Sequence, residues 1–179
     1  MPKKSYKNSV KKVLLESGKS KFSLLNDLTM DEDKYRETYR SVNPLQCPFE
    51  KTLNSRRCQC EKMEKIHLAD RECVGCVDKQ AWQNCHDFLE LLRKNALFAL
   101  KLTEIEGPLP HGKEIKVQNG SIIGLHKLLN QDEETKPDIY KLLDQALTQY
   151  QLFEKLPLDQ LMQSIVHFKA RETRKDKKK

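Results

Sequence analysis

Apolar residues recur at intervals of three and four along the second half of the chain, and this spacing predicts its main helices. The strongest stretch covers residues 79–102, where Asp78 is a suitable N-cap. Late in this stretch the apolar residues cover most of the helix circumference, which is typical of a core helix. The stripe consists of Trp82, Cys85, Phe88, Leu89, Leu92, Ala96 and Ala99. We therefore expect a central helix at about 79–102.

Two further stretches, residues 137–151 and 157–168, carry apolar stripes of the same kind. Each begins with a proline, which fits the first position of a helix because its missing N–H is not needed there. An acidic residue follows in each first turn, Asp138 and Asp159, where the helix dipole favours negative charge. The sequence therefore predicts a helical hairpin.

Shorter apolar patterns predict additional helices over residues 31–42, 48–56, 61–71 and 122–129. Between the central helix and residue 122 the pattern changes. Residues 107–112 are rich in glycine and proline and predict a rigid loop, and residues 115–118 alternate as in a short strand. Asn119-Gly120 predicts a turn, after which Ser121 can cap the next helix. The expected fold class is mainly α: a small helical domain with a cysteine-rich metal-binding segment (47–85) packed on the central helix.

The chain has 179 residues, which suits one domain, and we place it at residues 22–168. No apolar stretch approaches the roughly 20 residues that a membrane helix needs, so no membrane association is expected. Met1 and the following lysines are not succeeded by the apolar run of a signal peptide. The expected location is cytoplasmic.

The net charge of +7 is concentrated at the two ends of the chain. Residues 1–21 carry seven lysines and Glu16, a balance of +6, and residues 169–179 carry a balance of +5. The remainder, 22–168, therefore sums to 7 − 11 = −4. Basic ends suit a polyanion such as nucleic acid or an acidic protein surface. Solvated tails that aid solubility are the alternative, and we expect the 169–179 tail to be disordered.

All six cysteines fall within residues 47–85, and this cluster is the clearest chemical signal in the chain. In a reducing compartment clustered cysteines favour metal ligation, whereas secretion would favour three disulfides. Because a helix is expected to begin at Pro48, the dipole at its start should lower the pKa of Cys47. The candidate ligands are Cys47, Cys58, Cys60, Cys73, Cys76 and Cys85.

Two arrangements of these thiols remain open. In the first, Cys58 and Cys60 form one hook and Cys73 and Cys76 a second, with Gly75 permitting a tight turn, and the four bind zinc. Six thiols are too many for one zinc and too few for two, unless nearby histidines join. His67 and His86 lie within the same segment.

In the second arrangement Cys47, Cys76, Cys85 and one of Cys58 and Cys60 hold a [4Fe–4S] cluster. The C-x2-C-x2-C run of a ferredoxin is absent, so the ligands would come from separate loops and helix ends. Cys85 can instead be a buried core residue and not a ligand, since it lies on the apolar stripe.

Five cations lie beside the cysteines and can contact a nucleic acid backbone or offset the charge of a thiolate centre. They are Arg56, Arg57, Lys62, Lys65 and Arg71. No catalytic residue or reaction can be assigned. The expected function is a binding or regulatory metalloprotein with zinc or an iron–sulfur cluster that acts on nucleic acid or a protein complex. The alternative is an iron–sulfur redox or electron-transfer accessory protein, or an enzyme that uses such a cluster.

Overall fold

The computed structural model describes residue 34 and residues 37–68, 71–102, 109–129 and 135–169. Contacts within the chain divide it into two units, residues 1–42 and 43–179. The start of the domain expected over residues 22–168 lies outside the described residues. In the first unit residues 37–42 are helical, and the rest of the helix expected over residues 31–42 lies outside the described residues, apart from residue 34. The basic segment of residues 1–21 and all of the 169–179 tail beyond residue 169 also lie outside them.

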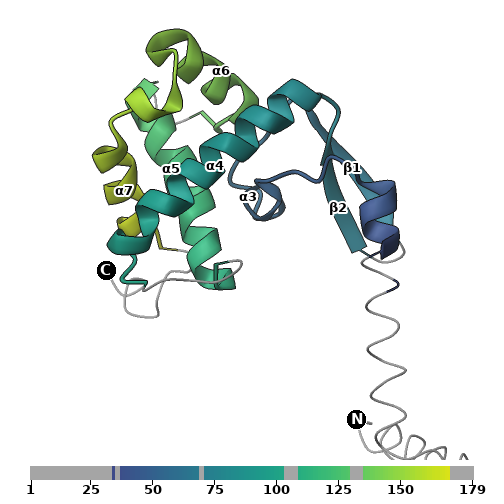
Figure 1. Cartoon of the computed structure of the whole chain (residues 1–179). Coiled ribbons are helices and arrows are strands. Elements are labelled where there is room, and N and C mark those ends of the chain that lie inside the picture. The colour runs from purple at the N-terminus through teal and green to yellow at the C-terminus, as the bar shows by residue number, and fades with distance from the viewer. Residues whose placement is uncertain (1–33, 35–36, 69–70, 103–108, 130–134, 170–179) are drawn as a thin grey trace, which may run out of the picture. The chain divides into compact units, whose positions relative to one another are not determined.

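The described part of the second unit is mainly helical and contains a two-stranded hairpin (Figure 1). The strands are β1 (Met63–Leu68) and β2 (Arg71–Cys76). A short helix, α3 (Glu50–Asn54), precedes them. The later elements are α4 (Lys79–Ala99), α5 (His111–Leu129), α6 (Ile139–Tyr150), the 3-10 helix η1 (Phe153–Lys155) and α7 (Leu158–His167).

Helix α4 confirms the predicted central helix. The Asp78 side chain accepts hydrogen bonds from the backbone N–H groups of Gln80 and Ala81, which fixes the helix start. The N-terminal end of α4 adjoins the hairpin, and the helix contacts α5, α6 and α7 farther along (Figure 1). Its predicted stripe is buried at Cys85, Phe88, Leu89, Leu92 and Ala96.

The helix predicted over residues 61–71 is wrong, because this segment forms the hairpin. The strands pair antiparallel, with Met63 opposite Cys76 and Ile66 opposite Cys73. Residues 45–47 run alongside β2, where the Cys47 N–H donates to the Val74 carbonyl at 2.9 Å and the Cys76 N–H donates to the Leu45 carbonyl at 2.9 Å. Pairing between strands thus determines the extended conformation of this segment. The helical spacing of its own apolar residues does not show that pairing.

The strand predicted over residues 115–118 and the turn at Asn119-Gly120 are also wrong, because both lie inside α5. The buried Asn119 side chain donates to the Ile115 carbonyl at 3.0 Å and accepts from the Ser55 hydroxyl at 3.1 Å. Gly120 allows α7 to approach closely, since a Cβ atom there would lie 2.6 Å from the Ile165 Cα. These two residues serve helix packing instead of a turn.

Helices α6 and α7 lie where the apolar stripes predicted them, although Asp138 and Pro157 are their N-caps. The Asp138 carboxylate accepts from the Lys141 N–H at 3.2 Å. Among the described residues, α7 packs mainly against α5 and also against α4, and α6 packs against the same two helices. The expected packing of α6 against α7 as a hairpin is therefore wrong, because each of these helices packs mainly on α4 and α5.

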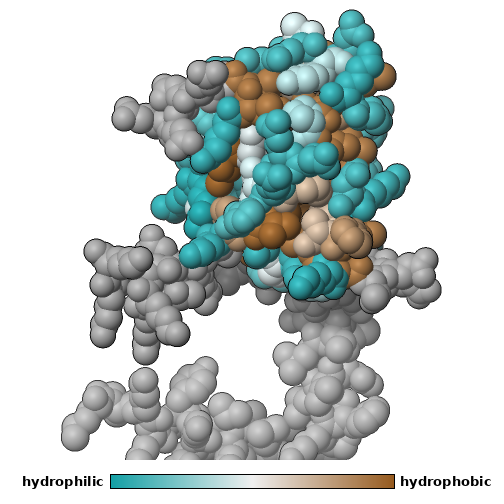
Figure 2. Space-filling model, turned by 90° about the vertical axis from the view of Figure 1, so that its left-hand side faces the viewer, coloured by the Kyte–Doolittle hydropathy of each residue, from teal (hydrophilic) through white to brown (hydrophobic). Residues whose placement is uncertain are grey.

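The face that carries α7 is mostly hydrophilic, with smaller apolar patches between the polar residues (Figure 2). None of the helices in the described ranges has the length and apolar character to cross a membrane.

Candidate metal centre

Four cysteines from four different segments meet where the hairpin joins α4. Cys47 precedes α3 and is held to β2 by its bond to Val74. Cys60 lies in the turn before β1, where its carbonyl accepts from the Met63 N–H at 3.3 Å. Cys76 ends β2 opposite Met63, and Cys85 lies on α4. Hairpin register and the start of α4 together bring these residues into one region.

The four thiols act on one another electrostatically in every pair. The charge of Cys76 raises the pKa of Cys47, Cys60 and Cys85. The charge of Cys60 raises the pKa of Cys47 and Cys85, and Cys47 also raises that of Cys85. Because Coulomb interactions weaken with distance, the four thiols lie near one another.

Burial is the main cause of the raised pKa at each of these thiols. It raises the pKa of Cys47 to about 12, outweighing a backbone hydrogen bond from Phe49. The expected fall in the pKa of Cys47 is therefore wrong. Helix α3 starts at Glu50, later than predicted, and its five residues supply little dipole to oppose the desolvation. Two of the four thiols are buried and two are half-buried, so a positive centre among them would help all four to ionise together.

Backbone groups form hydrogen bonds with the thiols of Cys60 and Cys76. Hydrogen bonds from the backbone of Lys62 and Tyr140 lower the pKa of Cys60 against the effect of burial, and one from Asp78 does so at Cys76. The Cys76 thiol also donates to the Asp78 carbonyl at 3.2 Å. Such backbone donors are typical around metal-bound sulfur, where they stabilise the thiolate and tune the centre.

The other two cysteines lie outside this group. Cys73 is buried and pairs with Ile66 across the hairpin. It stands three residues from Cys76 on one strand, so the two side chains point to opposite faces. Cys58 is buried, which raises its pKa to about 12, and the charges that act on it are those of Lys136 and Arg57. The two predicted hooks, 58–60 and 73–76, therefore do not share one centre.

The companions predicted for a zinc site have other roles. Gly75 lies within β2, where a Cβ atom would lie 2.7 Å from the Asn43 Oδ1 atom, so it permits close packing and not a turn. His67 is exposed on β1. The His86 ring stacks on Trp82 with centroids 5.4 Å apart and lies 3.8 Å from the Asp87 carboxylate. In the described ranges, no group of three or more Cys, His, Asp or Glu side chains is arranged to hold a metal ion.

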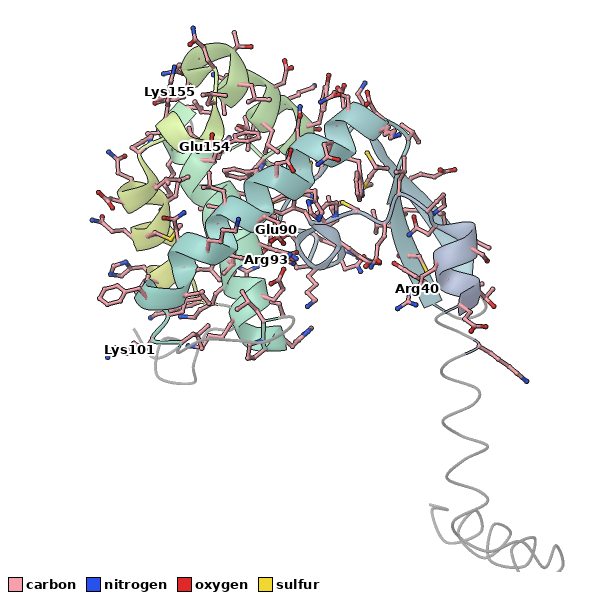
Figure 3. All side chains as sticks on the ribbon, viewed as in Figure 1. Arg40, Glu90, Arg93, Lys101, Glu154 and Lys155 are labelled. Carbon is pink, nitrogen blue, oxygen red and sulfur yellow. The ribbon has the colours of Figure 1, made fainter. Side chains whose placement is uncertain are left out.

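A buried polar network holds the Cys47 segment in place, and the sequence did not reveal it. The Gln118 amide donates to the Pro48 carbonyl at 3.0 Å and to the Glu114 carboxylate at 2.7 Å. Arg93 on α4 binds Glu114 through two hydrogen bonds of 2.7 and 3.2 Å. It also donates to Glu90 on the same helix at 2.7 Å, and Figure 3 labels these two residues. The spacing of Glu114 and Gln118 is that of one helix face, a signal hidden by the wrong strand prediction.

The cations predicted to bind anions do not form one surface. Lys62 lies 3.3 Å from Glu61 and 4.7 Å from the Tyr140 ring centroid, and Lys65 lies 3.5 Å from Glu72. Arg57 packs over the Phe168 ring at 4.9 Å, and the Arg71 side chain lies outside the described residues. Arg56 and Lys65 line one pocket.

Comparison of the chain with protein-family models, curated proteins and solved structures finds no match in any of the three. The assignment of a function therefore rests on the geometry of the four thiols and the pocket beside them.

Proposed function

We propose that this chain is an iron–sulfur protein that holds one [4Fe–4S] cluster through Cys47, Cys60, Cys76 and Cys85. The observation that carries the proposal is that these four thiols, each from a separate segment, lie near one another where the hairpin joins α4. Four cysteine thiolates are the usual ligand set of such a cluster. This choice selects Cys60 from the pair left open by the sequence.

The origin of the ligands favours a cluster over zinc, because they come from four separate segments and not from two short hooks. Because Zn–S bonds measure about 2.3 Å, a tetrahedral zinc site holds its sulfur atoms about 3.8 Å apart. A cubane of four irons lies between its ligands and needs a wider arrangement. The four thiols interact in every pair, yet no described group of side chains is arranged for a single ion. The distances between the four sulfur atoms in the metal-loaded protein therefore distinguish the two centres.

The cluster would join the hairpin to the helical body, because its ligands come from both. We infer that the protein is a cytoplasmic binding or regulatory protein in which the cluster stabilises a recognition surface. Nucleic acid or an acidic protein surface is the proposed partner, on the charge of residues 1–21 and 169–179. A reducing compartment suits a chain with six clustered cysteines.

Electron transfer is a second candidate function, and the uneven burial of the ligands favours it. Cys47 and Cys85 are buried, whereas Cys60 and Cys76 are half-buried. One edge of the proposed cluster would therefore lie close to solvent, where a redox partner can approach. A cluster with only a structural role has no need of such an edge.

Metal and sulfide analysis of protein purified without oxygen tests the proposal. We expect about four iron atoms and as many acid-labile sulfides per chain, with the visible absorbance of a cluster. If the analysis finds one zinc per chain and no sulfide, the centre is a zinc site and the proposed cluster is wrong. Reversible reduction of a cluster by a mild reductant would favour the electron-transfer role, and a redox-inert cluster would favour the structural one.

A further inference from the structure

A pocket of about 440 Å³ opens beside Cys58, on residues that the proposed cluster does not use. It is bounded by the end of α3, by one side of the β1–β2 hairpin and by the segment before α6. Leu53, Met63 and Val74 give it apolar walls, and Asn54 and Gln59 bring side-chain amides. This volume and mixed lining are typical of sites for small organic ligands.

The charges around the pocket favour an anion. Arg56, Lys65 and Lys136 contribute three positive charges to the lining, and Glu72 contributes one negative charge. Lys65 and Glu72 lie 3.5 Å apart, and both side chains are half exposed, so water screens their attraction. Lys136 is close enough to the buried Cys58 thiol for its charge to affect that group. The lining therefore retains an excess of positive charge.

Backbone contacts fix two of the three cations near the pocket. The Gln59 N–H donates to the Pro137 carbonyl at 2.9 Å, and the Ile139 N–H donates to the Gln59 carbonyl at 2.8 Å. These bonds hold Lys136 beside the Cys58 segment. Arg56 follows the end of α3 with a φ of 58°, and its N–H donates to the Leu53 carbonyl at 2.9 Å. This left-handed conformation ends α3, and Cys58 and Gln59, which follow it, line the pocket.

We propose that this pocket binds the phosphate and part of the body of a nucleotide, with Arg56, Lys65 and Lys136 around the phosphate. Guanidinium and ammonium groups donate charge-assisted hydrogen bonds to phosphate oxygens. The amides of Asn54 and Gln59 can bond the polar edge of the ligand, and the apolar walls can pack against its body. The nucleotide can be free in solution or be the terminal unit of a single strand, since both present the same chemistry.

Calorimetric titration of the full, metal-loaded chain tests this site with AMP, adenosine and a 5′-phosphorylated thymidine tetranucleotide. We expect AMP or the tetranucleotide to bind and adenosine to bind at least about tenfold more weakly. Lys136→Gln should weaken the phosphate-bearing ligand about tenfold. AMP binding alone would identify free nucleotides as the source, and tetranucleotide binding alone would identify a strand.

Lys141→Gln is the matched control, because Lys141 is an exposed cation that pairs with Glu61 at 3.6 Å and does not line the pocket. It should leave the affinity unchanged. The proposal fails if neither phosphate-bearing ligand binds, if adenosine binds as tightly as AMP, or if both lysine variants weaken binding equally. Iron content, measured in the same samples, keeps this result separate from the test of the cluster.

Discussion

The backbone N–H of Cys47 donates a 2.9 Å hydrogen bond to the carbonyl of Val74, although the two residues lie far apart in the sequence. Together with the bond from the Cys76 N–H to the Leu45 carbonyl, this contact places residues 45–47 along the edge of the hairpin. Cys47 thereby lies beside the end of β2, where Cys76 is found. Backbone pairing therefore brings two of the proposed ligands, Cys47 and Cys76, together without a metal.

Replacing a proposed ligand should remove the cluster. Cys60→Ala and Cys76→Ala are the most informative changes, because these two residues are only half-buried and their loss leaves the core intact. We expect severalfold less iron and sulfide per chain, since the cluster needs four thiolates. Iron and sulfide analysis of anaerobically purified variants measures the effect.

Cys58→Ala and Cys73→Ala are the matched controls, since both residues are buried and neither belongs to the group of four. Each should cost about 1 kcal/mol of stability through a small cavity while leaving the iron content unchanged. Loss of iron in the Cys73 variant, with iron retained in the Cys60 variant, would contradict the assignment.

Removing the cluster should loosen the hairpin before the helical body. The proposed ligands tie residues 45–47, the turn before β1 and the end of β2 to α4, whereas α5 and α7 pack together without them. Chelation should therefore speed amide hydrogen exchange at Cys47 and Cys76 and leave α5 and α7 protected. Equal acceleration throughout the protein would show that the cluster supports the whole fold, and no change would show that it supports none of it.

The sequence predicts correctly those helices whose apolar stripe and cap are local. Its predictions are wrong where contacts with distant segments determine the secondary structure. The stripe and N-cap of α4 are local, and the helix appears as expected. The hairpin depends on pairing with residues 45–47, and the glycine and asparagine inside α5 depend on the approach of α7 and α3. Cysteine spacing pointed to a shared centre, but strand direction separates Cys73 from Cys76, which a count of intervening residues cannot show.

Gly120→Ala should destabilise the protein because the contact between α5 and α7 leaves no room for a side chain. The added Cβ atom would lie 2.6 Å from the Ile165 Cα and 3.0 Å from the Ser164 carbonyl oxygen, and backbone atoms cannot move away easily. We expect a loss of about 1–3 kcal/mol in denaturant unfolding. Gly112→Ala is the control, since no atom of the described residues lies within 4 Å of the added Cβ, and the stability of this variant should be equal or slightly higher. Equal losses in the two variants would contradict the packing described for α5 and α7.

Arg93→Met should destabilise the protein by leaving Glu114 without its cationic partner, although the Gln118 amide still donates to it. The Glu114 side chain is only 4 % exposed, and Arg93 binds it through two hydrogen bonds. An uncompensated buried carboxylate costs about 3 kcal/mol. The exposed partner supplies the control: Glu90→Gln should cost less than about 1 kcal/mol. Chemical denaturation distinguishes the two, and a small effect of Arg93→Met would mean that Glu114 does not need its charge balanced.

Thr52→Val should raise stability slightly. Thr52 is fully buried, and its hydroxyl has no hydrogen-bond partner among the residues that the structure describes. Valine has nearly the same shape and removes an unpaired polar group, so we expect a gain of about 1 kcal/mol. The unfolding midpoint in urea measures it. A loss of stability would indicate that the hydroxyl binds a buried water molecule.

X-ray diffraction at the iron absorption edge from crystals grown without oxygen tests the central claim most directly. We predict one compact group of four iron atoms bonded to the sulfur atoms of Cys47, Cys60, Cys76 and Cys85, with Cys58 and Cys73 free of metal. A single zinc ion, a metal bound by Cys58 or Cys73, or no metal beside the four thiols would contradict it.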